Sequence, residues 1–493
     1  MVLIWFILAY NSLSTSIEGE EPEGWSEEIR LTFNDSRSLL PAIAVEGDNV
    51  HVVYLDNESG GKYDLFLWYV RSVDGGITWG SPTCLVGSPP TRVYAPKIAV
   101  NGDNIHVIWC QFDKKIHYMR SLDNGNTWDP EIIISQNVYH NTINWDIGVC
   151  GDNLHVIFSD INYKLTYTQS KDNGMTWSNP QILIPTTCKV VRTTIAVNGS
   201  NVHIAWEDNE RAGKFVSDIF YIKSEDNGLT WMPDINITGT INNTNYRPDI
   251  AVHNESIYVV YGHQYTNSRQ VFLSLSQDNG KTWIRNSNIS SSSGYIQWPA
   301  VAVEGEGVFV VWMDPESIHS MIHFRSSNNC GKTWGNITWL VNGSIYSTQP
   351  HIAVNENTIH TVWIYLLDGN YEVYYKRYLG FLNTTIDIDP DTLNLKSKGR
   401  WITVYIEIDK GYNLKDIDIS TILLENSIPA ENHPTEIGDY DNDGIPDLMV
   451  KFDRSEVEDI LGPSDAVTLK ITGSLTNGES FEGQDSIRVI NKP

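Results

Sequence analysis

Short apolar runs recur along most of this chain, separated by turns rich in glycine, asparagine and aspartate. One unit contains four such runs, at residues 96–100, 105–109, 116–120 and 131–134. Four short strands separated by tight turns are typical of one blade of a β-propeller. The pattern therefore predicts an all-β fold with a propeller of four-stranded blades over about residues 24–380. Seven units have a first run that ends in valine, which predicts seven blades: Val45, Val100, Val149, Val197, Val252, Val303 and Val354.

The last unit lacks a fourth strand, and the N-terminal segment contains a run that matches one. No fourth run follows the third strand at residues 371–377, whereas residues 25–31 resemble the fourth strands of the other units. Pairing of these two segments would join the ends of the propeller and remove two exposed sheet edges. We expect the N-terminal strand to complete the last blade.

Six units carry the motif Ser-x-Asp-x-Gly-x-Thr-Trp or a close variant between the third and fourth strands. Its spacing of about 50 residues is typical of a propeller or solenoid. An aspartate can accept hydrogen bonds from its own turn, glycine permits a positive φ, and the tryptophan ring can be buried between blades. We expect a structural role for the third motif position, with calcium or substrate binding as the weaker alternative. This position is occupied by Asp74, Asp123, Asp172, Asp226, Asp278 and Asn329.

One position in the second strand is a histidine in five units and Tyr258 or Phe309 in the other two. A residue that recurs with the blade and is replaced by another aromatic is expected to fill space rather than to bind metal. The histidines are His51, His106, His155, His203 and His360.

The six motifs resemble the Asp-box (BNR) repeats of the sialidase superfamily, over about three quarters of the chain. The resemblance implies a β-propeller whose boxes lie away from the active site. It leaves the activity open, because Asp-box propellers include hydrolases, sorting receptors and assembly factors. Sialidases have six blades, three arginines that bind the substrate carboxylate, a Tyr–Glu nucleophile pair and an acid/base Asp. Sialidases also carry an early Phe/Tyr-Arg-Ile-Pro motif. This chain departs from the pattern in its seven units, and its nearest match to that motif is residues 246–249, Tyr-Arg-Pro-Asp, in the middle of the chain.

Loops between second and third strands should share one face with the arginines that precede first strands. A sugar carboxylate requires guanidinium contacts, and a retaining glycosidase requires a nucleophile beside an acid of raised pKa. Side-chain type and predicted face select five candidates for a glycan or peptide site, which would be catalytic residues in an enzyme. A solvated acidic rim is the alternative. The candidates are Arg192, Arg247, Glu207, Asp208 and Tyr246.

The repeat ends near Gly380, and a different pattern follows. Residues 392–396, 401–406 and 467–471 alternate like half-buried strands, and a short helix is expected at residues 454–461. These features predict a separate β-sandwich-like domain over residues 381–493.

This second domain contains the segment Asp-Tyr-Asp-Asn-Asp-Gly-Ile-Pro-Asp at residues 439–447. Oxygen donors at alternate positions followed by glycine are typical of a calcium loop, and the segment resembles the D-x-D-x-D-G loops of dockerins. Val450 stands where an EF-hand has its last glutamate, and a polar turn without an ion is the alternative. The predicted ligands are the side chains of Asp439, Asp441, Asp443 and Asp447 and the carbonyl of Ile445.

The charge composition limits the kinds of partner that the chain is expected to bind. The chain has 34 Lys and Arg and 61 Asp and Glu, a net charge of -27, which disfavours nucleic acid and anionic membranes. Residues 1–23 form a signal-like leader that is too short to span a membrane, and Asn-x-Ser/Thr sequons also favour export. No other segment is apolar enough to cross a membrane.

These observations favour a secreted or cell-surface propeller that binds glycans or extracellular proteins and carries a calcium-stabilised accessory domain. An exo-α-sialidase or another glycoside hydrolase is the first alternative, and a structural component of a surface layer or filament is the second. Convergence of three arginines on one point would favour the sialidase.

Overall fold

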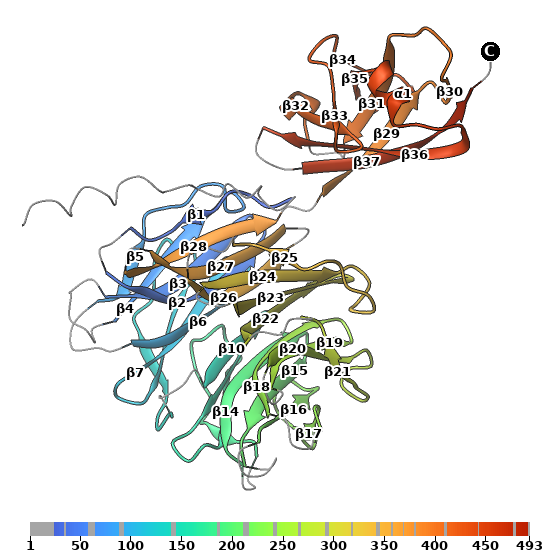
Figure 1. The fold of residues 1–493 in the computed structure, drawn as a ribbon. Coiled ribbons are helices and arrows are strands. Elements are labelled where there is room, and N and C mark those ends of the chain that lie inside the picture. The colour runs from blue at the N-terminus through green and yellow to red at the C-terminus, as the bar shows by residue number, and fades with distance from the viewer. Residues whose placement is uncertain are drawn as a thin grey trace, which may run out of the picture.

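The computed structural model gives the arrangement of most of the chain (Figure 1). The predicted leader at residues 1–23 lies outside the described residues. The described residues are 24–33, 36–57, 65–87, 93–139, 144–184, 188–210, 216–239, 244–264, 268–290, 295–316, 319–341, 346–355, 358–367, 369–378, 381–408, 412–441, 443–476 and 480–491.

Most strands belong to four-stranded antiparallel sheets that follow one another along the chain. Five of these sheets each contain four consecutive strands: β2 (Ser38–Glu46), β3 (Asn49–Asp56), β4 (Phe66–Ser72) and β5 (Thr83–Val86); β6 (Val93–Asn101), β7 (Asn104–Gln111), β8 (Ile116–Ser121) and β9 (Ile132–Ser135); β10 (Trp145–Cys150), β11 (Asn153–Ser159), β12 (Leu165–Ser170) and β13 (Gln181–Ile182); β14 (Val190–Asn198), β15 (Asn201–Asp208), β16 (Asp218–Ser224) and β17 (Ile235–Asn236); β18 (Thr244–His253), β19 (Ser256–Gln264), β20 (Arg269–Ser276) and β21 (Ile284–Asn288).

An eight-stranded sheet contains the last repeats and the N-terminal strand. Its two halves are joined by a single parallel residue pair, Ser320 with Tyr346, among the described residues. The N-terminal strand pairs antiparallel with the third strand of the last repeat, through Ile29 with Tyr375. The strands are β22 (Gln297–Glu304), β23 (Gly307–Glu316), β24 (His319–Ser327) and β25 (Thr338–Trp339) in one half, and β26 (Tyr346–Asn355), β27 (Thr358–Leu367), β28 (Asn370–Tyr378) and β1 (Ile29–Arg30) in the other.

Apolar side chains hold neighbouring repeats together. Among the described residues, seven hydrophobic clusters each combine side chains from two successive repeats. One of them joins the last repeat to the first through Val362 and Val373 on one side and Ile43 and Val50 on the other. The repeats therefore pack as a closed ring, and the predicted all-β propeller is confirmed.

Each Asp box forms hydrogen bonds within its own turn. In the third box, Asp172 Oδ1 accepts from Ser170 Oγ at 2.7 Å and from Thr176 N at 2.8 Å, and Asp172 Oδ2 accepts from Thr176 Oγ1 at 2.5 Å. Asn329 accepts from Thr333 N in the same way at 2.9 Å. This geometry accounts for the residue type at this position without any ligand. The same bonds occur at Asp74, Asp123, Asp226 and Asp278.

Histidine–tyrosine pairs connect each of five repeats to the Asp box of the next. His155 Nδ1 lies 2.6 Å from Tyr167 Oη, and the Tyr167 ring meets the edge of Trp231 in the following box at 5.0 Å. Burial lowers the pKa of His155 to about 4, so this histidine is neutral at neutral pH. The five histidines therefore hydrogen-bond as well as fill space. The other pairs are His51–Tyr69, His106–Tyr118, His203–Tyr221 and His360–Tyr375.

The two repeats without this histidine precede the atypical boxes. The repeat with Tyr258 precedes the box that contains Asn329, and the repeat with Phe309 precedes the unit that lacks a box. In that last unit the N-terminal Trp25 packs edge to face against Phe324 at 5.0 Å. Trp25 thus occupies the place that a box tryptophan takes in the other repeats.

The remaining strands form a nine-stranded sheet with its own hydrophobic core, which contains residues between Ile386 and Val489. Figure 1 shows these strands as a body apart from the propeller. None of the described helices is long and apolar enough to cross a membrane. The elements are β29 (Phe381–Asp389), β30 (Thr392–Asn394), β31 (Trp401–Ile408), η1 (Leu414–Asp416), β32 (Ile417–Leu424), β33 (Ile428–Pro429), β34 (Glu436–Gly438), β35 (Asp447–Asp453), α1 (Arg454–Asp459), β36 (Ser464–Leu475) and β37 (Ser480–Ile490).

Candidate functional site

The first strand of six repeats contains a bulge at the same place. The pairing register with the second strand shifts there, and a non-glycine residue adopts a φ between 33° and 56°. Such a conformation costs about 1–3 kcal/mol per residue and tends to occur at functional sites. In five of the six bulges the next residue is proline, which cannot donate to the sheet ladder. The bulge residues are Leu40, Ala95, Arg192, Arg247, Trp298 and Gln349.

Side chains of the preceding repeat hold three of these bulges by accepting a hydrogen bond from the backbone N–H. Gln349 Oε1 accepts from Leu40 N at 3.0 Å, and Asn144 Oδ1 accepts from Arg192 N at 2.7 Å. Glu207 Oε2 accepts from Arg247 N at 3.1 Å. Neighbouring repeats therefore position Leu40, Arg192 and Arg247 in their strained conformations.

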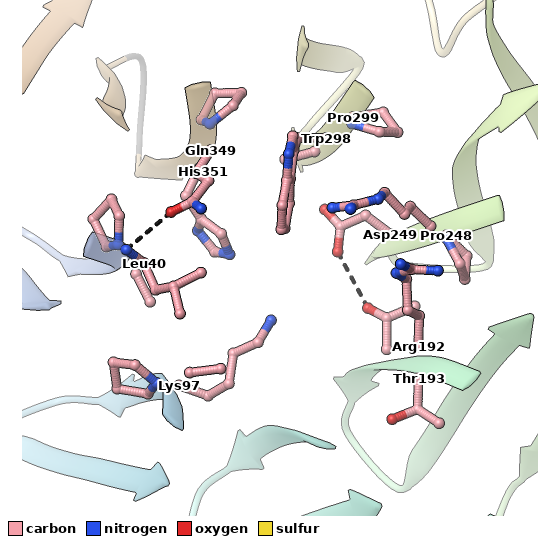
Figure 2. Close-up of a pocket in the computed structure, with 18 residues that line it drawn as sticks. Leu40, Lys97, Arg192, Thr193, Pro248, Asp249, Trp298, Pro299, Gln349 and His351 are labelled. Carbon is pink, nitrogen blue, oxygen red and sulfur yellow. Dashed lines mark hydrogen bonds between the residues drawn. The ribbon is translucent and has the colours of Figure 1, made fainter. Parts of the chain in front are cut away.

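The bulges surround a cavity of about 120 Å³ at the centre of the ring. Figure 2 shows Lys97, Arg192, Trp298 and His351 reaching into this space from four different strands. We call this cavity the axial pocket. Because its walls come from six repeats, its shape depends on closure of the ring.

Two arginines give the axial pocket its positive charge. The Arg247 guanidinium stacks 3.6 Å above the Trp298 ring, and its nitrogens have no hydrogen-bond acceptor among the described residues. Arg192 Nη1 donates to Glu207 Oε2 at 3.1 Å. Burial and the charge of Arg192 lower the pKa of Arg247 to about 9, so it remains a cation at neutral pH. The pocket therefore offers a guanidinium that is fixed beside an aromatic ring and has no ion-pair partner in the described part of the chain.

Four of the five predicted site residues lie together. Glu207 contacts both Arg192 and Arg247, and burial raises the pKa of this carboxyl against the opposing effect of Arg192. The charges of Arg192, Arg247 and Glu207 also act on the buried hydroxyl of Tyr246, which donates to the Ile296 carbonyl at 2.8 Å.

The fifth predicted residue, Asp208, is separated from this group. Its carboxylate is fully buried and accepts from Glu210 N at 3.0 Å and Lys189 N at 3.4 Å. It does not line the axial pocket. Asp208 therefore stabilises a loop conformation in this structure.

The inner part of the pocket contains ionisable residues that the sequence analysis missed. Lys97 Nζ lies 3.5 Å from Asp146 Oδ1. Asp249 accepts from Thr194 Oγ1 at 3.2 Å and Val301 N at 2.8 Å, so it links three neighbouring repeats. Burial raises the pKa of Asp249 to about 6. The sequence signal that could have identified Lys97 and Asp249 is a proline inside a predicted first strand, followed directly by a charged residue.

The predicted calcium loop brings acidic side chains together. Carboxylate oxygens of Asp439, Asp441 and Asp447 lie within 4.8 Å of one another. The turn is closed by Gly444 N, which donates to Asp439 Oδ2 at 3.2 Å. Burial and then the charges of Asp441 and Asp439 raise the pKa of Asp447.

The other two predicted calcium ligands differ in their surroundings. Asp443 belongs to a second acidic group with Asp441 and Glu407, a residue of β31 that the sequence analysis did not select. Ile445 donates its N–H to Asp443 Oδ1 at 2.8 Å, and its carbonyl was the group expected to bind the ion. Only the pairing of β31 with β35 brings Glu407 to this loop.

Solved structures with a similar fold include enzymes that act on glycans. A polysaccharide lyase of family PL25, an ulvan lyase, aligns with 71% of this chain and 95% of its own at 10% identity and a TM-score of 0.51, both alone and bound to -[GlcA(1-4)Rha3S]-. Trypanosoma rangeli sialidase aligns with 73% of this chain and 60% of its own at 13% identity and a TM-score of 0.43. A protein of unknown function from Dyadobacter fermentans aligns with 72% and 99% at 14% identity and a TM-score of 0.48.

No family model and no curated protein matches this chain. At these identities the likeness to solved structures concerns the fold alone, which is a β-propeller.

Proposed function

We propose that this chain is a secreted or cell-surface β-propeller that binds an acidic group of a glycan in the axial pocket. The observation that carries this proposal is the Arg247 guanidinium, which is stacked on Trp298 and lacks an acceptor among the described residues. A guanidinium that is fixed on an aromatic ring at a half-buried position can bind a carboxylate or sulfate through two parallel hydrogen bonds. An anionic ligand therefore resolves the electrostatic imbalance of the pocket.

A glycan fits this pocket better than a simple anion. The indole ring of Trp298 offers an apolar surface beside the cation, as is common in sites for small organic ligands. The ulvan lyase of similar fold is bound to a glycan with glucuronic acid, which supports the choice of ligand class for testing.

The proposal includes seven blades and a separate C-terminal domain. The eight-stranded sheet counts as two blades, because a single residue pair joins its halves in the described part of the chain. The N-terminal strand β1 supplies the fourth strand of the last blade. Residues 381–493 then form the second domain, which is supported by its own hydrophobic core.

We also propose that the loop at residues 439–447 binds calcium. Three converging carboxylates repel one another, and a divalent cation would offset most of their charge. Calcium should raise the Tm of the C-terminal domain, and Asp441→Asn should remove this increase. A thermal melt that is unchanged by EDTA would contradict the site.

Binding of glucuronic acid and N-acetylneuraminic acid, measured by NMR titration, tests the axial pocket. Arg247→Ala should abolish binding and Trp298→Ala should weaken it at least ten-fold, because the cation and its platform are lost. Arg488→Ala is the matched control, since Arg488 lies in the C-terminal sheet and pairs with Asp465. Unchanged affinity in Arg247→Ala would refute the proposal.

A glycoside hydrolase, including an exo-α-sialidase, is the second candidate. It is favoured by Glu207, whose carboxyl has a pKa raised by burial and contacts Arg192. It is opposed by Tyr246, whose hydroxyl is engaged by a backbone carbonyl rather than by a base. Release of fluorophore from a fluorogenic sialoside by the wild type, lost in Glu207→Gln, would establish this activity.

A further inference from the structure

A third arginine lies beside the axial pocket, between two tyrosine rings. The Arg269 guanidinium lies 5.1 Å from the centre of the Tyr246 ring and 5.6 Å from that of Tyr295. Its Nε donates to Gln264 Oε1 at 3.2 Å. These three contacts fix the plane of the guanidinium, while its terminal nitrogens have no acceptor in the described part of the chain.

Arg269 is close to the arginine of the axial pocket. Tyr246 directly precedes Arg247 in β18, so one tyrosine side chain separates the two cations. The charge of Arg269 contributes to the lowered pKa of Arg247, which places the two groups within electrostatic reach. A ligand that extends from the axial pocket across Tyr246 would meet Arg269 next.

Other arginines of the propeller form ion pairs with carboxylates, which Arg247 and Arg269 do not do in the described part of the chain. Arg192 and Arg120 each donate to a carboxylate, Glu207 and Asp129 respectively. Arg247 and Arg269 have no such partner among the described residues, although the chain contains 61 acidic residues. The Glu207 carboxylate acts on the charge of Arg247 without pairing with its guanidinium in the described contacts, and a bound anion would further offset the repulsion between the two cations.

The rings around Arg269 also provide a surface for a sugar. Tyr295 is 53% exposed. A parallel β-bridge pairs the backbone of Arg269 with that of Tyr295, which fixes the positions of their Cα atoms relative to each other. Tyr246 is held by its hydrogen bond to Ile296, the residue after Tyr295. An exposed tyrosine ring beside an unpaired guanidinium can stack on a sugar ring while the cation binds its acidic group.

We propose that Arg269 and Tyr295 form a second subsite for an acidic sugar residue, so that the ligand is an acidic oligosaccharide or polysaccharide rather than a single terminal sugar. This inference rests on the proposed function, which places the first acidic group in the axial pocket. The shared ligand chemistry is a carboxylate or sulfate carried on adjoining sugar units.

Isothermal titration with three probes tests the second subsite: glucuronic acid, a hyaluronan tetrasaccharide and a chondroitin sulfate tetrasaccharide. The wild type should bind a tetrasaccharide at least ten-fold more tightly than glucuronic acid. Tighter binding of both tetrasaccharides indicates a carboxylate at the second subsite, whereas tighter binding of the chondroitin form alone indicates a sulfate. Equal affinity for all three probes would overturn the proposal.

Variants separate the second subsite from the axial pocket. Arg269→Gln should remove the gain for the tetrasaccharide and leave the affinity for glucuronic acid unchanged. Tyr295→Ala should weaken tetrasaccharide binding at least three-fold, and Tyr295→Phe should retain it, because the ring rather than the hydroxyl makes the contact. Arg488→Ala serves as the control, and Tm values verify that each variant is folded.

The outcomes distinguish this proposal from the proposed function. Wild-type tetrasaccharide affinity in Arg269→Gln, together with loss of binding in Arg247→Ala, overturns the second subsite and leaves the axial pocket standing. Loss of glucuronic acid binding in Arg269→Gln also overturns it, because Arg269 would then belong to the first site. A wild type that binds none of the probes refutes both proposals. If Arg269→Gln does not fold, Tyr295→Ala decides the question alone.

Discussion

The Asp boxes and the axial bulges each occur in six repeats, at opposite ends of the blade. In the first repeat, Leu39 beside the bulge pairs with Leu55, whereas the box begins at Ser72, which pairs with Val50 at the other end of β3. The boxes repeat nearly the same residues, and their polar groups are satisfied within the turn. The bulges repeat a backbone shape but carry different side chains.

The two kinds of position differ in what constrains their residue types. A position that must satisfy its own turn and pack on the preceding repeat accepts few residue types, which here are Asp and Asn. A position that faces the axis requires only a common backbone, so each repeat is free to supply a different chemical group. The axial pocket obtains its cations, aromatic ring and amide from such equivalent positions in different repeats.

The largest effect is expected at the boxes, where Gly174→Ala tests their contact with the preceding repeat. A Cβ at Gly174 would overlap the Tyr118 hydroxyl, whereas the control Gly151 also has a positive φ but no atom within 4 Å of the added Cβ. We expect Gly174→Ala to cost about 3 kcal/mol or more and Gly151→Ala about 1 kcal/mol, by urea and thermal unfolding. Equal costs would mean that the boxes do not depend on this contact.

The next effect concerns the axial side, where Asp249→Asn tests a buried carboxyl. Its pKa of about 6 lies above the unfolded value of about 4, so ionisation lowers stability as pH rises through this interval. The asparagine oxygen can still accept from Val301 N, and its amide nitrogen can donate to the Thr194 hydroxyl. We expect Asp249→Asn to be more stable than wild type by up to about 3 kcal/mol above pH 6 and no more stable near pH 4. A pH-independent difference in unfolding free energy would contradict this.

A smaller effect with the opposite sign is expected for Asp172→Asn. The hydrogen bond from Thr176 lowers the pKa of Asp172 to about 2, so its contribution to stability is present above about pH 4 and is lost as pH falls toward 2. The variant should have a Tm a few degrees lower at neutral pH, and the two melting curves should converge in acid. Asn329 shows that this turn accepts an amide. Curves that remain parallel throughout would argue against the ionised carboxylate as the cause.

The smallest effect on stability is expected at Arg247, where function and stability should separate. Glycine tolerates the φ of 53° at this position, and Arg247→Gly also removes an unpaired cation. The Tm should therefore not fall, and could rise by an amount equivalent to about 1 kcal/mol, while glycan binding is lost. A clear loss of stability would show that the Arg247–Trp298 stack supports the fold.

Sequence reasoning reached the architecture because the repeats are local. Each blade strand is short, and each Asp box forms its hydrogen bonds within a few residues of chain, as between Asp172 and Thr176. The period therefore predicts the propeller and the position of every box without any knowledge of distant contacts. The same reasoning selected Arg192, Arg247, Glu207 and Tyr246 from side-chain type and face.

The remaining residues of the axial pocket and of the acidic loop come together through contacts between segments that are distant in the sequence. No motif distinguished Trp298 and Arg269 from other aromatic or basic residues. Asp208 had the right residue type, but backbone N–H groups occupy its carboxylate. Glu407 joins the acidic loop only because β31 pairs with β35.

The succession of repeated units can be read from the amino-acid sequence, because hydrogen bonds and apolar periodicity within about 50 residues are encoded locally. The set of side chains that meet at the axis follows from the folded ring, because the pocket is built from strands as far apart in the chain as those of Leu40 and Gln349. Closure of the ring brings these residues together, and closure is a property of all the repeats at once.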